Sequence, residues 1–92
     1  MANHKSAVKR NRQSQVRRLR NRSNRTKMKS AIKSVYSAIE ENSAEKAQEA
    51  LRLAIPVIDR TAMKGAVHKR NASRKVSRLT RHVNSFVAQA QA

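Results

Sequence analysis

Apolar residues recur at helical spacing along most of this 92-residue chain, and no stretch alternates apolar with polar side chains as a half-buried strand would. Between about residues 5 and 41 an apolar seam occupies only the second half, at Met28, Ile32, Val35 and Ile39. After residue 42 a second stripe comprises Ala44, Ala47, Leu51, Ala54, Ile55, Ile58 and Ala62. Between about residues 67 and 88, and just beyond, a third comprises Ala72, Val76, Leu79, Val83, Phe86 and Ala90. Three such stripes can close one core, so we predict an all-α three-helix bundle.

Residues that start and stop helices support these three segments. Asn42, followed three residues later by Glu45, resembles a capping box that would open the second helix. The only glycine, Gly65, suits the position just after the end of that helix. The only proline, Pro56, falls inside it, where it removes a backbone donor and crowds the preceding turn, so we expect a kink there.

The first helix should extend beyond the bundle. Before Met28 its only large apolar residues after Val8 are Val16 and Leu19, which do not continue the later seam. A helix of ~35 residues spans about 50 Å, whereas a compact chain of this length has a diameter of about 32 Å. We therefore predict one domain over residues 1–92, in which residues 1–24 form a basic N-terminal extension of the first helix. Because a helix charged all round is not self-stabilising, we expect this extension to be weakly ordered until phosphates surround it.

Charge is the most unusual feature of the composition. Lys and Arg number 22 against 5 Asp and Glu, which gives a net charge of +17. Residues 1–34 hold 12 basic and no acidic side chains, residues 35–59 are net −3, and residues 60–82 hold 8 basic and no acidic side chains. This distribution predicts a polyanionic partner that meets two basic arms. The acidic middle, which includes Glu45 and Glu49, should turn away from it.

Helical geometry places the charge of the third helix. With Lys69 at zero and 100° per residue, its core positions fall within an arc of about 260° to 360°. On the opposite side, at about 100° to 180°, fall Arg70, Arg74, Arg78 and Arg81. A single-sign row of this kind repels itself, which favours a phosphate-facing role over a merely solvated surface.

Several classes of function are excluded or disfavoured. Without cysteine there is no disulfide framework, thiolate zinc site or cysteine nucleophile. His4, His68 and His82 have no paired carboxylates close in sequence, and one glycine cannot build a phosphate-binding loop. We therefore expect no enzymatic activity, cofactor, metal or small-molecule substrate. For His68, local packing or hydrogen bonding and a phosphate or ribose contact are both open.

The remaining composition narrows the partner and the compartment. Tyr36 and Phe86, the only aromatic residues, should fill the core rather than stack on bases. No apolar run approaches a membrane span or a signal-peptide core, so we expect a soluble intracellular protein. Charge alone also permits a nucleoid-type basic DNA-binding protein. A basic membrane-surface protein is disfavoured, because the basic N-terminal half has no continuous apolar face and no Trp or Phe anchor.

Two segments resemble a known family. The opening MANHKSAVKR, followed by NRSNRTKMKSAIK, and the stretch DRTAMKGAVHKRNASRKVSRL from Asp59 to Leu79 are similar to the bacterial small-subunit ribosomal proteins numbered twenty. The most specific part is the spacing of Lys64, Gly65, His68, Lys69, Ala72, Arg74, Ser77, Arg78 and Leu79. The chain departs from the family at Arg70, where Asn is more usual, and at Val76, where Lys is common.

The resemblance implies a three-helix bundle with a long first helix, no enzymatic activity, and direct binding to 16S rRNA early in assembly. It also implies a monomer among other components of the 30S subunit, in the cytoplasm. Together with the charge pattern, the resemblance makes the following residues candidates for RNA binding: Lys5, Lys9, Arg10, Arg12, Arg17, Arg18, Arg20, Arg22, Arg25, Lys29, Lys33, Lys64, His68, Lys69, Arg70, Arg74, Lys75, Arg78 and Arg81.

Overall fold

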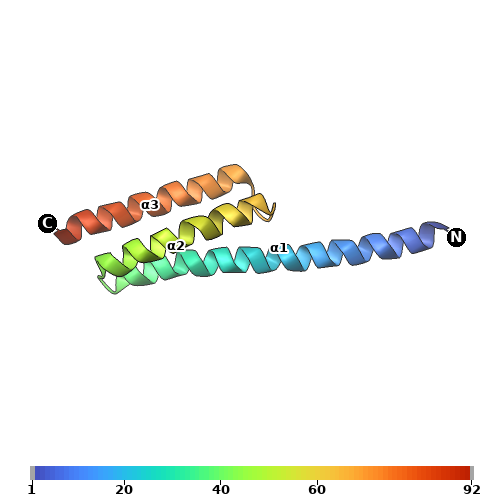
Figure 1. Cartoon of the computed structure of the whole chain (residues 1–92), viewed down its shortest axis with the longest axis horizontal. Helices are drawn as coiled ribbons and strands as arrows, with labels where there is room; N and C mark the ends of the chain where they lie inside the picture. The colour runs from blue at the N-terminus through green and yellow to red at the C-terminus, as the bar shows by residue number, and fades with distance from the viewer. Residues whose placement is uncertain (1, 92) are drawn as a thin grey trace.

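Three helices, each antiparallel to the next, make up the described part of the chain. The computed structural model describes the backbone of residues 2–91 and the side chains of residues 6–90. The helices are α1 (Ala2–Glu40), α2 (Ala44–Met63) and α3 (Lys69–Gln91). Figure 1 shows α2 running back along the second half of α1 and α3 returning along α2. The predicted all-α three-helix architecture is confirmed, and each helix lies within a few residues of its predicted range.

The first helix extends far beyond the bundle. The molecule measures 72 × 22 × 14 Å, and its radius of gyration of 18.3 Å exceeds the value of about 12 Å for a compact chain of this length. In Figure 1 the N-terminal half of α1 has no other helix beside it. Every described side chain from residue 6 to residue 20 is exposed, and Asn24 is the first of the described side chains of α1 to be buried. The predicted overhang is confirmed.

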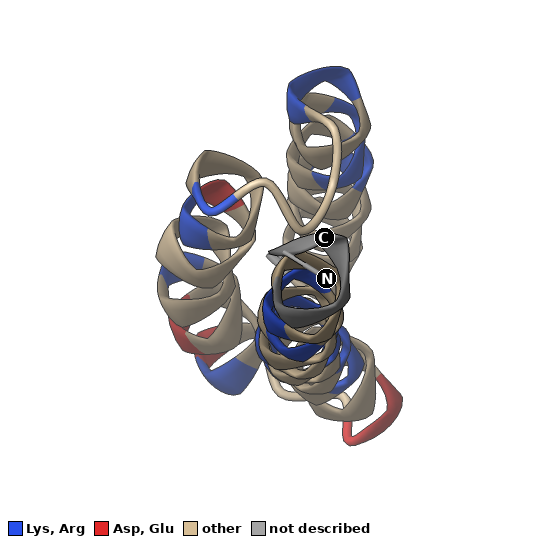
Figure 2. Ribbon diagram, turned by 90° about the vertical axis from the view of Figure 1, so that its right-hand side faces the viewer, with Lys and Arg blue, Asp and Glu red and all other residues tan. Residues whose placement is uncertain are grey.

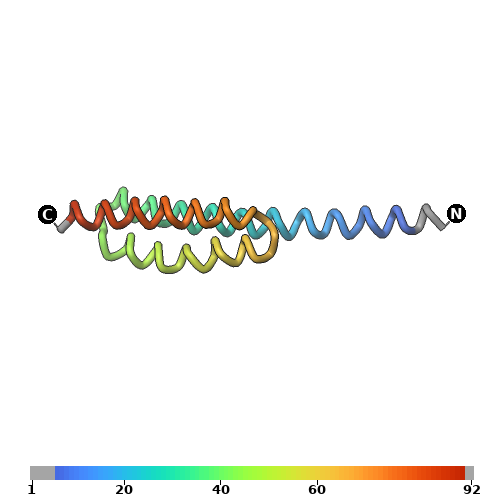
Figure 3. The backbone as a smooth tube through the Cα atoms, turned by 90° about the horizontal axis from the view of Figure 1, so that it is seen from above, coloured from blue at the N-terminus to red at the C-terminus, as the bar shows by residue number. Residues whose placement is uncertain are grey.

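One fully buried aliphatic side chain from each helix anchors the core. Val35 of α1, Ile58 of α2 and Val83 of α3 have no exposed surface. Around them lie six further buried residues, namely Met28, Ala38, Ala47, Ala54, Ala72 and Leu79. Four of these six are alanines, which allow helix axes to approach closely. Viewed from above, α3 lies over the second half of α1 and α2 lies to one side, so the helices surround the core as a triangle (Figure 3).

The helical seams predict this core with few errors. Ile32 and Ile39 of α1 pack against the buried cluster, as do Leu51 of α2 and Val76 and Phe86 of α3. Ala90 was expected in the core but is exposed, because it lies on the last full turn of α3, beyond the residues that α2 covers.

The turn between α1 and α2 differs from the predicted capping box. Asn42 has a φ of 57°, and it occupies the left-handed position just after α1. The N–H of Asn42 donates to the carbonyl of Ile39 (3.0 Å) and that of Ser43 to the carbonyl of Ala38 (3.2 Å), which closes α1 with a Schellman motif. Ser43 is therefore the N-cap of α2, and its hydroxyl accepts from the N–H of Lys46 at 3.2 Å. The capping box predicted for Asn42 and Glu45 is wrong because Asn42 ends one helix and the next residue starts the other.

The end of α2 follows the prediction. Gly65 has a φ of 78°, and the N–H of Ala66 donates to the carbonyl of Thr61 at 3.1 Å. Glycine adopts this left-handed conformation without steric cost. Pro56 lies inside α2, and the helix continues through it without a break. The kink expected there stays a prediction.

Candidate nucleic-acid interface

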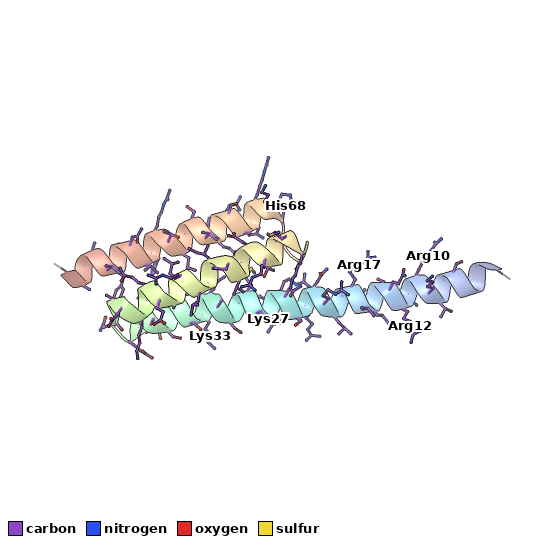
Figure 4. The ribbon with its side chains drawn as sticks, viewed as in Figure 1. Arg10, Arg12, Arg17, Lys27, Lys33 and His68 are labelled. Atoms are coloured by element: carbon purple, nitrogen blue, oxygen red, sulfur yellow. The ribbon has the colours of Figure 1, made fainter. Side chains whose placement is uncertain are left out.

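The extension of α1 presents basic side chains in every direction. Between residues 6 and 25 none of its Lys or Arg side chains is buried. Arg10 and Arg12 leave opposite sides of the helix in Figure 4. The predicted candidates Lys9, Arg10, Arg12, Arg17, Arg18, Arg20, Arg22 and Arg25 are therefore all accessible. The side chain of Lys5 lies outside the described residues.

Within the bundle, α1 keeps basic residues on its outer side. Lys29 and Lys33 are exposed, while Met28 and Val35 of the same helix are buried. Lys27 is also exposed and was not among the predicted residues. Lys27 lies next to Met28 of the apolar seam. The sequence of α1 alone therefore does not show where Lys27 lies relative to α2.

The third helix presents the predicted arginine face. Arg70, Arg74, Arg78 and Arg81 are exposed, and Lys69 at the helix start is exposed as well. Lys75 is half-buried, because at about 240° around α3 it borders the arc of core positions. The structure thus separates Lys75 from the arginine row and leaves the row itself open to a partner.

His68 has a defined structural role. Its ring Nδ1 accepts from the N–H of Arg70 at 3.1 Å, and its carbonyl accepts from the N–H of Ala72 at 3.0 Å. The imidazole therefore caps the first turn of α3, and Nδ1 carries no proton when it does so. The ring is exposed at the start of α3 (Figure 4), so Nε2 is available to donate to a phosphate or ribose oxygen. Both roles left open by the sequence are compatible with this geometry.

The basic side chains have almost no acidic neighbours. In the part of the chain whose side chains are described, one ion pair forms, between Lys46 Nζ and Glu41 Oε2 at 3.4 Å. Both groups are largely exposed, and exposed pairs contribute little to stability. Figure 2 shows the acidic positions confined to α2 and to the end of α1, with none on α3. The charge of the extension and of the arginine row is thus uncompensated within the molecule.

A hollow between α1 and α2 gathers residues that sequence reasoning missed. It is lined by Asn24 and Lys27 of α1, by Arg60 of α2 and by Lys64, the C-cap of α2, and of these four only Lys64 was predicted. Lys64 follows Arg60 by four residues, about one helical turn, at the C-terminal end of α2. The four-residue spacing of Arg60 and Lys64 is visible in the sequence. Whether these two residues lie opposite Lys27 depends on how α1 and α2 pack.

The aromatic residues differ from expectation. Tyr36 is 42 % exposed, and its ring meets that of His82 edge-on, with centroids 5.3 Å apart. The prediction that Tyr36 fills the core is wrong, because it lies about 100° around α1 from the buried Val35. The contact joins α1 to α3 on the surface. Phe86 is half-buried and packs on the core.

The described residues form neither a metal site nor a membrane-spanning helix. Among the described residues, no three His, Cys, Asp or Glu side chains converge as metal ligands would. Within the same residues, no helix combines the length and apolar character needed to cross a bilayer.

The sequence of the chain is similar to those of known proteins with which this basic surface is consistent. The family described as ribosomal protein S20 matches residues 2–84. The chain is 55 % identical over 86 residues to the small ribosomal subunit protein bS20 of Syntrophobacter fumaroxidans, covering 94 % of this chain and 100 % of the relative. It is 57 % identical over 88 residues to the bS20 protein of Desulfotalea psychrophila, covering 96 % and 99 % of the two chains. Against that of Syntrophus aciditrophicus it is 56 % identical over 89 residues, covering 97 % and 100 %.

Proposed function

Because the chain belongs to the ribosomal protein S20 family and is thereby a structural, non-enzymatic component of the small ribosomal subunit, we propose that it binds 16S rRNA directly. In this proposal it stabilises the fold of the RNA during assembly by neutralising phosphates. Its place is in the 30S subunit of the bacterial cytoplasm, as a single copy among the other subunit components.

The observation that carries the proposal is the uncompensated basic surface. The exposed Lys and Arg side chains of the extension and the arginine row of α3 have no acidic partner in the described residues. RNA segments that fold together repel one another through their phosphates, and a row of guanidinium groups between them offsets that repulsion. Arginine can bind phosphate in a bidentate manner, which favours a fixed geometry over loose attraction.

The shape of the molecule suits contact with more than one RNA segment. The extension carries basic groups all around its circumference, whereas the arginines of α3 form a single row on one face. The deep, narrow groove of A-form RNA admits no side-chain code for bases, so specificity should come from the shape of the RNA. A rod with charge on all sides, joined to a bundle that carries an arginine row on α3, would therefore recognise a particular arrangement of RNA helices.

A salt titration of binding to naked 16S rRNA tests the many-contact mechanism. With ~8 to 10 phosphates engaged, the logarithm of affinity should fall against the logarithm of salt with a slope of roughly −6 to −9. A slope of about −2 would contradict the mechanism. Footprinting on the same RNA would identify the segments that the protein protects.

The competing interpretation is a nucleoid-type DNA-binding protein. Competition between folded 16S rRNA and duplex DNA at physiological salt separates the two. The proposal expects the rRNA to win clearly, and equal binding to both would favour the DNA-binding interpretation.

A further inference from the structure

The hollow between α1 and α2 is lined by a residue that carries a buried polar group without a partner. Asn24 of α1 is 7 % exposed, and its Nδ2 amide forms no hydrogen bond within the described structure. Buried amide groups are nearly always hydrogen-bonded, so an exception calls for an explanation. Asn24 lines a cavity of about 370 Å³ that lies between the two helices.

Three positive side chains line the same cavity. Lys27 comes from α1, Arg60 from α2, and Lys64 is the C-cap of α2. None of them forms an ion pair, because the one ion pair of the described residues is that of Lys46 and Glu41. No Asp or Glu lines the cavity. Three like charges converge on one hollow only at an energetic cost, which an anion inside the hollow would remove.

The available hydrogen-bond donors also favour an oxyanion. The hydroxyl of Thr61, which borders the cavity, already donates to the carbonyl of Val57 at 2.7 Å. Arg60 donates only its Nε, to the carbonyl of Pro56 at 3.4 Å, so both of its terminal amino groups are available. The amide of Asn24 and the ammonium groups of Lys27 and Lys64 are further donors, and no carboxylate lines the hollow.

We propose that this cavity is a binding site for one phosphodiester of the RNA backbone, held by Asn24, Lys27, Arg60 and Lys64. This inference rests on the proposed function and gives it a defined phosphate position. The cavity is about ten times the volume that one water molecule occupies, so it can take a phosphate together with an adjoining sugar. That size favours a backbone segment over a free phosphate ion.

The site changes which parts of the molecule face RNA. It lies where the extension of α1 meets the bundle, because Asn24 is the first of the described side chains of that helix to be buried. It also brings the C-terminal end of α2 to the RNA, while the acidic N-terminal end of α2 stays away from it. The RNA strand would thus pass from the extension across the α1–α2 hollow.

Two charge-matched variants test the site. Arg60→Gln and Arg52→Gln each remove one positive charge from an exposed position on α2, but Arg52 does not line the cavity. Arg60→Gln should weaken binding to 16S rRNA roughly tenfold, because it removes a charge-assisted hydrogen bond to phosphate. Arg52→Gln should weaken it no more than about twofold, through the general field alone. Equal losses for the two variants would overturn the site.

A third variant separates binding from folding. Asn24→Leu replaces the unpaired buried amide by an apolar group, so it should keep or raise the melting temperature and still weaken RNA binding roughly tenfold. If Asn24→Leu binds with wild-type affinity, the amide does not contact phosphate and the site is wrong. Equal losses for the two arginine variants, or wild-type affinity of Asn24→Leu, would contradict the site but not rRNA binding by the wild-type protein. Failure of the wild-type protein to bind rRNA would contradict the proposed function itself.

The source of the phosphate is tested with two probes. The side-chain amide signals of Asn24 are followed by NMR while either a 16S rRNA fragment or inorganic phosphate is added at the same concentration of phosphate groups. The RNA fragment should shift these signals and inorganic phosphate should not. An equal shift with inorganic phosphate would identify a free-phosphate site and overturn the assignment to the RNA backbone.

Discussion

The two halves of α1 share one continuous helix but depend on different partners. From Asn24 onward, a buried residue recurs every three to seven positions, at Met28, Val35 and Ala38. From residue 6 to residue 20, every described side chain is exposed. The second half owes its order to the core, as most helices in proteins do. The first half has no such support, so its order must come from whatever neutralises its charge.

This difference separates the information for folding from the information for binding. In the second half the apolar seam decides which face turns inward, and the basic residues take the remaining surface. From residue 6 to residue 20 no face turns inward, so every described basic residue there stays available to an RNA partner. In the proposed function, the length that overhangs the bundle therefore serves RNA binding alone.

Deletion of the extension should have the largest effect on binding. Removing residues 1–20 removes seven Lys and Arg residues and leaves every buried residue in place. Affinity for 16S rRNA should fall at least about 100-fold at moderate salt, and the salt slope should become smaller by about 5. Filter binding over a salt series measures both quantities.

The same deletion should leave the bundle folded. Its melting temperature, followed by circular dichroism, should change by no more than about 2 °C, because no core contact is lost. Cooperative unfolding of the truncated protein at a much lower temperature would contradict the separation of the two halves.

A matched pair of valines tests the comparison through stability. Val35 is fully buried and Val16 is 51 % exposed, and both lie on α1. Val35→Ala should destabilise the protein by about 2 kcal/mol, because it leaves a cavity at the centre of the core. Val16→Ala should change stability by less than about 0.5 kcal/mol, since it alters only an exposed position. Urea unfolding monitored by circular dichroism compares them, and equal losses would show that the extension packs on the bundle.

The sequence predicts the parts of this structure that depend on one helix at a time. The seam of Met28, Ile32, Val35 and Ile39 predicts which half of α1 joins the bundle, because the period of the seam is local information. The position of Gly65 predicts the end of α2, because a left-handed residue is needed there.

Errors arose where two elements compete or meet. Asn42 and Ser43 are adjacent residues that can both cap a helix, and the pattern alone does not decide which one ends α1. Tyr36 is apolar enough for a core position, but its place about 100° from Val35 puts it on the surface. The hollow formed by Lys27, Arg60 and Lys64 was missed because it depends on the relative position of two helices. The RNA contacts of the predicted residues stay predictions.

A smaller effect concerns the cap of α3. His68→Ala removes the acceptor for the N–H of Arg70 and should cost about 1 kcal/mol, whereas His68→Asn restores an N-cap acceptor and should cost less than about half of that. Thermal unfolding of the two variants measures the difference. RNA affinity adds a second reading, because Asn cannot place a donor where Nε2 lies. If His68→Asn restores stability but not affinity, His68 both caps α3 and contacts RNA, and if it restores both, the cap is its only role.

Hydrogen–deuterium exchange along α1, with and without 16S rRNA, tests the central claim most directly. In the free protein at low salt, amides of residues 6–20 should exchange rapidly while those of residues 28–39 are protected by the core. On binding rRNA, residues 6–20 should become protected to a similar degree. Strong protection of residues 6–20 in the free protein, or none in the complex, would contradict the account that RNA orders the first half of α1.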